Sequence, residues 1–338
     1  MQICQSQNQC IFVPMKSIQE LQQLFNQYLE KQPFEKQPAE LYEPFRYILS
    51  LGGKRMRPTM VLLGCELFSH DAQQSLSQAM AVELFHNFSL IHDDIMDNAP
   101  KRRGQPTVHE KFNHNIAILS GDIMLVYAYE FLISNAGNKM EPLLRLFNKT
   151  AIEVCEGQQW DMNFEKLNDV TVEQYLKMIE LKTAVLLGCA FKIGALIGNA
   201  NEEDAERIYE VGKKLGIAFQ LQDDILDSFG DEKKFGKLSG GDIIQNKKTL
   251  LLIEAMEKAN PAQRKQLLDW MAKKEFDPKE KVKAVMDLYY ELNIRAIAEK
   301  EMMKYFKDAM LTLDAIDIPE MSKTGLRQFA EALIVREN

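Results

Sequence analysis

The chain contains few cysteines and no paired-cysteine motif. Its five cysteines are an odd number among 338 residues, and no two of them form a Cys-x-x-Cys pair. A disulfide framework is therefore not indicated, and we expect free thiols in a reducing cytoplasm. The five are Cys4, Cys10, Cys65, Cys155 and Cys189.

Long apolar runs and an excess of positive charge are also missing. No apolar stretch approaches the roughly 18 to 20 residues that a membrane-spanning helix needs, and the N-terminus has no signal-peptide core. The formal net charge is −8, which argues against a general nucleic-acid-binding protein because such proteins present a basic face. We expect a cytoplasmic protein without a transmembrane segment and without a nucleic-acid partner.

Strand patterns are absent as well, because no stretch shows sustained alternation of apolar and polar residues. Helical patterns fill most of the chain instead, and residues 101–109 are predicted to form a loop. Ser17 and Glu20 form a capping box for the first predicted helix. Further helices are predicted at 38–51, from 58, and at 73–98, 115–135, 140–165, 171–199, 202–229, 240–259, 261–274, 278–312 and 318–335.

No sharp break in composition divides this helical region. Residues 15–338 are therefore interpreted as a single all-α domain, a bundle of roughly ten or more helices. Residues 1–14 are rich in Gln and Cys and have no helical period, so we expect a disordered N-terminal extension, with Met15 as a second candidate for the start.

One acidic signature occurs twice, 130 residues apart, within apolar helical stretches. The copies are Asp93-Asp94-Ile95-Met96-Asp97 and Asp223-Asp224-Ile225-Leu226-Asp227. On a helix the first and last Asp of each copy differ by only about 40°, so each copy points its carboxylates in one direction. Such clusters repel one another unless cations lie between them, and Mg²⁺ held by a few carboxylates completes its shell with water and phosphate. The alternative is two solvated charge runs, which apolar flanks disfavour.

Basic residues gather near these clusters in an otherwise acidic chain, which indicates a small anionic ligand. Lys54 and Arg57 are three residues apart, so both can reach one diphosphate, Arg as a planar fork and Lys as a compact charge. Arg102 and Arg103 follow the first cluster directly. Lys182, Lys237 and Lys247 complete the set, although each of these lysines alone reads as a surface residue.

The chain strongly resembles the trans-isoprenyl diphosphate synthases, also called the polyprenyl synthetase family, of the short-chain, farnesyl or geranylgeranyl type. The resemblance extends from about residue 40 to 336. It rests on Gly52-Gly53-Lys54-Arg55-x-Arg57-Pro58, Leu90-Ile91-His92-Asp93-Asp94 through Arg102-Arg103-Gly104, Gly157-Gln158-x-x-Asp161, Lys182-Thr183, Phe219-Gln220-x-Gln222-Asp223-Asp224-Ile225-Leu226-Asp227, Gly236-Lys237 and Lys247-Lys248-Thr249. The resemblance implies a helical bundle around a central cavity, a homodimer, and condensation of isopentenyl diphosphate with a dimethylallyl, geranyl or farnesyl diphosphate.

The resemblance also assigns roles to individual residues. Three Mg²⁺ ions, for which Mn²⁺ can substitute, are expected on Asp93, Asp94, Asp97, Asp223, Asp224 and Asp227. Isopentenyl diphosphate is expected to contact Lys54, Arg57, His86 and Arg103. The allylic diphosphate is expected to contact Arg102, Lys182, Thr183, Gln220, Lys237 and Lys247. A lone helical His is more often a packing residue, but His86 lies two turns before Asp93, as in the family; His92 is interpreted as a packing residue or a support behind the site.

The expected reaction ionises the allylic diphosphate and then joins the resulting cation to isopentenyl diphosphate, with loss of a proton. A dry wall of Phe85, Phe88, Leu90 and the helix around 123–127 is expected to keep water from the cation. Phe88, with Ser89 and Phe85, is predicted to set chain length, because it lies five residues, about 7 to 8 Å, from Asp93. Phe88 pointing sideways into the core is the alternative.

Other enzymes and one non-enzyme share parts of this pattern. A class I terpene cyclase ionises similar substrates but lacks the second Asp-rich motif and needs no Lys54 and Arg57. An HD-type metal phosphohydrolase needs further histidine ligands that the chain does not supply in a convincing pattern. A non-catalytic partner subunit is expected to have lost one Asp cluster. Bacterial farnesyl synthases have two extra residues in the first Asp motif, which are absent here. Farnesyl and geranylgeranyl diphosphate are both candidate products, and the missing insertion slightly favours the twenty-carbon geranylgeranyl diphosphate.

Overall fold

The computed structural model describes residues 15–230 and 240–334. The predicted N-terminal extension, Cys4, Cys10 and Lys237 lie outside the described residues. The remaining cysteines, Cys65, Cys155 and Cys189, are free thiols, as predicted.

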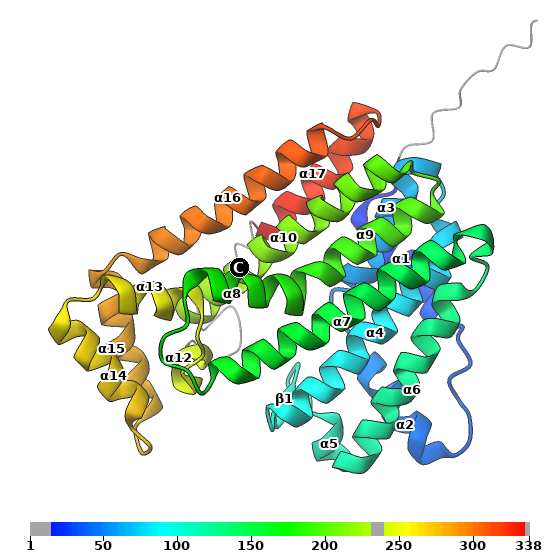
Figure 1. The fold of residues 1–338 in the computed structure, drawn as a ribbon. Helices are drawn as coiled ribbons and strands as arrows, with labels where there is room; N and C mark the ends of the chain where they lie inside the picture. Colours follow the sequence, from blue (N-terminus) through cyan, green and yellow to red (C-terminus); the bar gives the residue numbers. More distant parts are fainter. Residues whose placement is uncertain (1–14, 231–239, 335–338) are drawn as a thin grey trace, which may run out of the picture.

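The described part of the chain is almost entirely helical, which confirms the predicted all-α class (Figure 1). The α-helices are α1 (Ile18–Glu30), α2 (Ala39–Ser50), α3 (Met56–Ser69), α4 (Leu76–Met96), α5 (Val108–Lys111), α6 (His114–Ile133), α7 (Met140–Phe164), α8 (Val172–Ile179), α9 (Val185–Ile197), α10 (Glu202–Phe229), α12 (Gly241–Gln245), α13 (Leu250–Lys258), α14 (Pro261–Ala272), α15 (Pro278–Glu291), α16 (Ile294–Asp314) and α17 (Glu320–Ile334). Short 3₁₀ turns η1 (Ala72–Ser75) and η2 (Gly137–Lys139) precede α4 and α7.

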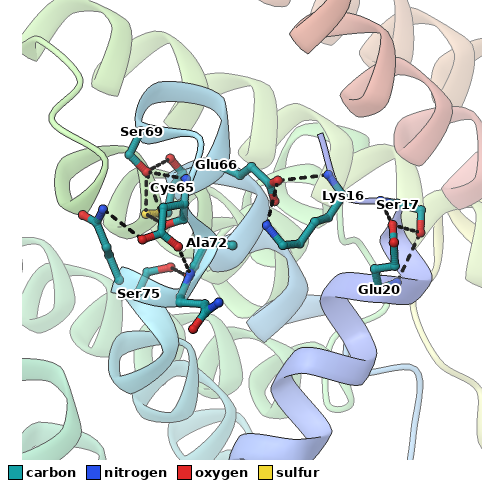
Figure 2. A network of polar contacts seen from close by, with 11 residues as sticks. Lys16, Ser17, Glu20, Cys65, Glu66, Ser69, Ala72 and Ser75 are labelled. Atoms are coloured by element: carbon teal, nitrogen blue, oxygen red, sulfur yellow. Dashed lines mark hydrogen bonds and ion pairs between the residues drawn. The ribbon is translucent and has the colours of Figure 1, made fainter. Parts of the chain in front are cut away.

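Polar contacts fix the start of the described chain. The predicted capping box is present, since the Ser17 hydroxyl accepts the Glu20 N–H and the Glu20 carboxylate accepts the Ser17 N–H. Both the backbone N–H and the ammonium of Lys16 donate to Glu66 of α3, at 2.9 and 3.3 Å, as Figure 2 shows. Because Glu66 is only 1% exposed, this ion pair attaches the segment before α1 to the interior of the bundle.

Three long helices form the centre of the bundle. Helix α9 lies between α3 and α10, and α16 runs along the outer side of α10 (Figure 1). Glycines permit this close approach: a Cβ at Gly194 would collide with the Val61 carbonyl of α3, and one at Gly212 would lie 2.8 Å from Gly188 of α9. The second Asp cluster therefore stands on a helix that is held firmly on two sides.

The helix predicted at 171–199 changes its pitch where it carries two of the predicted site residues. Between α8 and α9 the backbone forms a π-helical turn, η3 (Glu180–Ala184), which contains Lys182 and Thr183. A Cβ at Gly157 of α7 would collide with the Lys182 backbone, so the glycine lets this turn press against α7. Single π turns inside α-helices are frequent at functional sites.

Two other predicted helices are wrong as continuous elements. The helix predicted at 240–259 is divided into α12 and α13, and the helix predicted at 278–312 is divided into α15 and α16. Asn246 and Asn293 stand at the breaks with φ of +57° and +55°. Asn adopts this left-handed conformation more readily than most residues, and a single such residue ends a helix.

The loop predicted at 101–109 contains a small sheet, so the expectation of no sheet was wrong here. Strands β1 (Lys101–Arg102) and β2 (Gln105–Pro106) pair antiparallel around Arg103 and Gly104, which have φ of +53° and +78°. Two-residue strands are too short to show alternation in a sequence. The hairpin places Arg102 and Arg103 beside the end of α4.

Helix α6 corrects the expectation that no stretch is long and apolar enough to cross a membrane. An 18-residue window within its 20 residues has a mean hydropathy of 1.7, and 33% of this window is buried. It packs along α4 and also contacts α2, α5 and α7, as a core helix does. Leu119 and Val126 remain 58% and 64% exposed, so α6 is apolar on more than one face.

Candidate active site

A cavity of about 300 Å³ opens beside the first Asp cluster and continues into the bundle. Phe85, Phe88, Ser89 and Asp93 of α4 line it together, so Phe88 faces the cavity. The opposite wall is not the predicted segment 123–127. It comes from α7 and α9, through Val154, Cys155, Gln158, Gln159, Met162 and Leu186.

Aromatic rings close the deep end of the cavity. The Phe88 ring centroid lies 4.7 Å from His92 and 5.7 Å from Phe85. Phe85 in turn contacts Phe147 of α7 with centroids 5.2 Å apart, and Phe147 contacts Tyr129 at the same distance. Phe88 and Phe85 both line the cavity, and Phe85 is only 1% exposed.

The first Asp cluster lies in the last turn of α4. Asp94 is 1% exposed and accepts a hydrogen bond from Arg102 at 2.8 Å, and a second Arg102 nitrogen lies 2.7 Å away. Burial raises the pKa of Asp94 despite this arginine. Partial burial, followed by the charge of Asp93, also raises the pKa of Asp97. A helix C-terminus is itself negative, so this end of α4 favours a bound cation.

Lys182 connects the π-helical turn to the first cluster. Its ammonium donates to Asp161 of α7 at 2.5 Å and lies 3.4 Å from Asp93. Burial lowers the pKa of Lys182, but Asp93 and Asp161 outweigh it and the net direction is upward. The lysine therefore stays charged at the mouth of the cavity, where the sequence predicted a diphosphate contact.

The second cluster stands near the end of α10, and its middle carboxylate is buried. Asp224 is 5% exposed; it accepts a short hydrogen bond from the Tyr175 hydroxyl and one from Gln220 at 3.0 Å. Gln220 in turn accepts from the Thr183 hydroxyl at 3.2 Å. Burial, followed by the charge of Asp242, raises the pKa of Asp224 to about 8.

Asp227 binds the start of α12. One of its carboxylate oxygens accepts the backbone N–H of Asp242 at 2.9 Å, and its backbone carbonyl accepts that of Gly240 at 2.6 Å. Burial, followed by Asp227, raises the pKa of Asp242 to about 6. Lys247, which follows α12, lines a second pocket of about 100 Å³ with Asp161, Asp224 and Gln220. This arrangement places Lys247 between the two clusters.

The predicted isopentenyl diphosphate residues gather at the start of α3. Arg57 lies 3.0 Å from the His86 ring nitrogen, and burial lowers the pKa of Arg57 to about 10. Burial, followed by Arg57, lowers the pKa of His86, so its ring is neutral. The Arg103 guanidinium lies under Gly53 and donates to the Gly52 carbonyl. Lys54 is exposed beside them.

Four residues near these sites were given no role by sequence reasoning. Arg55, with φ of +46°, forms an ion pair with Glu83 at 2.5 Å, and both are buried. This pair fixes the junction between the loop that carries Lys54 and the start of α3, which carries Arg57. Tyr175 and Asp242 complete the second cluster, but neither belongs to a repeated motif, so no sequence signal pointed to them.

The carboxylates of the two clusters offer oxygen donors, the type of ligand atom that hard divalent ions prefer. Oxygen donors suit Mg²⁺, and one buried oxygen of Asp93 has no hydrogen-bond partner. Across residues 15–230 and 240–334, no three acidic, histidine or cysteine side chains converge on one metal position. The rest of a Mg²⁺ shell would come from water and diphosphate oxygens, which is usual for this ion.

Comparison with known proteins places the chain in a family. The sequence profile described as polyprenyl synthetase matches residues 38–289. The chain therefore belongs to the polyprenyl synthetase family, as its motifs predicted, and the predicted class of enzyme, a prenyltransferase, is confirmed with it. The HD-type phosphohydrolase and terpene cyclase interpretations are set aside.

Individual relatives agree over most of the chain. A geranylgeranyl diphosphate synthase of Methanosarcina mazei is 41% identical, covering 89% of this chain and 91% of its own length. A short chain isoprenyl diphosphate synthase of Methanocaldococcus jannaschii is 42% identical, covering 73% and 75%. A crystal structure of a geranylgeranyl pyrophosphate synthase is 40% identical with a TM-score of 0.91, covering 96% of this chain and 100% of that chain.

Proposed function

We propose that the protein condenses isopentenyl diphosphate with an allylic diphosphate and releases a product of twenty carbons, geranylgeranyl diphosphate. The single observation that carries the proposal is the 300 Å³ cavity that runs from Asp93 to Phe88. Its polar mouth suits the diphosphate, and its apolar depth suits the hydrocarbon. The resemblance to geranylgeranyl diphosphate synthases supports this length, and the fifteen-carbon product is the alternative.

The allylic diphosphate is assigned to the mouth between the two Asp clusters. Lys182 lies 3.4 Å from Asp93, and Lys247 shares a pocket with Asp224, so both ammonium groups can reach a diphosphate held there. Arg102 forms an ion pair with Asp94. It also lies beside Asp93, which supports contact between Arg102 and the same diphosphate. Isopentenyl diphosphate is assigned to Lys54, Arg57, His86 and Arg103.

The proposed chemistry needs charge stabilisation more than a protein nucleophile. Mg²⁺, when held by Asp93, Asp97, Asp223 and Asp227, would neutralise the departing diphosphate. Lys182 contributes a fixed positive charge at the same place. Thr183, Phe88 and Met162 line the cavity. The Thr183 oxygen and the Gln220 oxygen that accepts its hydroxyl are assigned to the allylic cation, and the two apolar side chains would keep its surroundings dry. The released diphosphate is the base that accepts the proton.

We also infer a homodimer formed through α6. A shallow apolar hollow of about 420 Å³ lies on this helix, lined by Leu41, Ile116, Leu119, Ile123 and Val126 among others. An exposed apolar patch of this kind is typical of an interaction surface. A second copy can cover it with the same residues, as in two-fold dimers. Light scattering of a Leu119→Glu, Val126→Glu variant tests this, since an unchanged dimer would contradict the assignment.

Product analysis tests the proposed function directly. Purified protein is incubated with labelled isopentenyl diphosphate and Mg²⁺ together with dimethylallyl, geranyl or farnesyl diphosphate in turn, and the dephosphorylated products are separated by chromatography. We expect twenty-carbon product from every primer that is accepted. Products of fifteen carbons only would favour the alternative, and absence of any condensation would refute the proposal.

The assignment of the two diphosphates has its own test. Lys54→Ala is expected to raise KM for isopentenyl diphosphate, and Lys247→Ala is expected to raise KM for the allylic substrate, each about tenfold or more, because each removes a charged contact. If Lys54→Ala changed only the allylic KM, the two sites would be reversed.

A further inference from the structure

A lysine outside every motif is buried against the turn that follows α12, and it lines a pocket with Asp242 and Lys247. Lys281 of α15 is 1% exposed, and its ammonium donates to the Ile244 carbonyl at 3.0 Å and to the Asn246 side-chain oxygen at 2.7 Å. The Phe276 ring centroid lies 4.4 Å away. Burying an ammonium group is costly unless its hydrogen bonds are made, so these contacts are strongly preferred.

The two acceptors belong to one short turn. Asn246 has φ of +57° and ends α12, and its side-chain amide donates to the Met271 carbonyl at 3.1 Å. Lys281 and Met271 therefore hold the Asn246 side chain from both sides. The next residue is Lys247, whose backbone N–H donates to the Asp242 carbonyl at 2.9 Å. The direction in which Lys247 leaves the turn depends on Asn246.

The other end of this turn is tied to the Asp cluster itself. Asp227 accepts the Asp242 N–H at the start of α12, and Gly240 lies so close to α15 that a Cβ there would be 2.8 Å from Val282. Helix α12 is therefore held between α10 and α15. Figure 1 shows this group of helices, with α12 (yellow-green) beside α15 and α14 (yellow to gold).

We infer that Lys281 is a positioning residue, which holds the turn at Asn246 so that Lys247 faces the mouth between the two Asp clusters. The inference rests on the proposed role of Lys247 as an allylic diphosphate contact. It extends the active site to α15, a helix that carries none of the family's motifs. An apolar side chain would fill the space beside Phe276 with a smaller desolvation cost than a lysine. Both hydrogen bonds of the Lys281 ammonium go to the turn at Asn246.

The test compares Lys281→Met with the matched control Lys283→Met. Methionine keeps the buried stem and removes the donors, while Lys283 is an exposed lysine two residues along the same helix. We expect Lys281→Met to raise KM for the allylic diphosphate about tenfold, with KM for isopentenyl diphosphate changed less than about twofold. Lys283→Met should match the unaltered enzyme. An unchanged allylic KM, or a parallel change in all kinetic parameters, would overturn the inference.

A second variant covers the case in which Lys281→Met does not fold. Asn246→Gly retains access to a positive φ and removes the acceptor, so it should give the same selective rise, and a Lys281→Met, Asn246→Gly double variant should be no worse than the larger single effect. A normal allylic KM in Asn246→Gly would refute the inference. If Lys247→Ala itself left the allylic KM unchanged, the assignment of Lys247 would fail first, so the two failures are distinguishable.

Discussion

The two Asp clusters have nearly the same letters but different surroundings. At the end of α4, Asp94 is paired with Arg102, and Asp93 lies 3.4 Å from Lys182. On α10, the corresponding Asp224 accepts hydrogen bonds from two neutral groups, Tyr175 and Gln220. The pKa of Asp224 accordingly rises to about 8, because hydrogen bonds from neutral groups offset its burial less than a positive charge would.

This difference in surroundings indicates that the two clusters have different roles. The first cluster has protein cations beside it, and under the proposed function Mg²⁺ and diphosphate would take their place. The second cluster lies beside Asp242, and burial together with the proximity of these carboxyl groups favours their protonated forms. Under the proposed function, a cation that arrives from solution would displace these protons. In both copies the middle Asp is the most deeply buried of its set, at 1% and 5% exposure, and supports the outer two.

The largest expected effect removes the outer carboxylates or the metal. Asp93→Ala and Asp223→Ala should each lower kcat by about 10³-fold or more, since each loses a ligand that stabilises charge in the transition state. Excess EDTA should abolish condensation altogether. Steady-state incorporation of labelled isopentenyl diphosphate measures both. Full activity in EDTA would refute the metal-dependent mechanism for either cluster.

A smaller effect is expected from the neutral partner of the second cluster. Tyr175→Phe removes the hydroxyl that donates to Asp224, at a cost of about 1 to 3 kcal/mol in the free energy of unfolding. We expect kcat to fall about tenfold, because Asp224 also accepts a hydrogen bond from Gln220, which the proposed function assigns to the reacting carbons. Urea unfolding and steady-state kinetics measure these effects. A loss as large as that of Asp223→Ala would mean that Tyr175 touches the substrate.

The pH dependence of stability should separate the clusters in the metal-free protein. The pKa values of Asp242 and Asp224 are raised from 3.8 to about 6 and about 8. At pH values between 3.8 and these raised values, the folded protein therefore binds more protons than the unfolded chain. Their stabilising contribution is fully present below pH 3.8 and is lost as pH rises, up to about pH 6 for Asp242 and up to about pH 8 for Asp224. The loss is up to about 1.4 kcal/mol per pH unit for each proton.

Thermal unfolding in EDTA from pH 5 to 8.5 measures this loss. Asp224→Asn should flatten the upper part of the curve, whereas Asp97→Asn at the first cluster should leave that part in place. A stability that rose between pH 6 and 8 in the unaltered protein would contradict the assignment of buried, proton-binding carboxyl groups to the second cluster.

The smallest effect on rate is expected at the floor of the cavity. Helix α4 carries both Asp93 and Phe88, whereas α10 contributes no residue to the lining of this cavity. Of the two helices that carry the Asp clusters, only α4 should therefore affect product length. Phe88→Ala should release longer chains, with total turnover within about threefold, because it removes bulk but no charge.

A matched control for this variant is Phe306→Ala on α16, a partly buried ring remote from the cavity, which should leave product length unchanged. Chromatography of the dephosphorylated products gives the distribution. An identical distribution in folded Phe88→Ala protein would show that another residue sets the length. Further lengthening in a Phe85→Ala, Phe88→Ala double variant would identify Phe85 as the second floor.

Much of this protein's fold could be predicted from interactions between residues that are close together in the sequence. The capping box at Ser17, the helical periods and the absence of alternation were sufficient for the all-α class, because each depends on residues within a few turns of one another. The repeated Asp motif and the basic residues around it identified the family. The breaks at Asn246 and Asn293 were missed, since a left-handed Asn leaves the apolar period on both sides intact.

Only the tertiary structure decided which residues meet. The wall opposite Phe88 comes from α7 and α9 rather than from the segment around 123–127, because the packing of apolar helices depends on shape as well as on pattern. Tyr175 lies 49 residues from Asp224 and Lys281 lies 35 residues from Asn246, and no local signal links either pair. Buried polar groups must find hydrogen-bond partners wherever the fold provides them, so such contacts become visible only when the chain is folded.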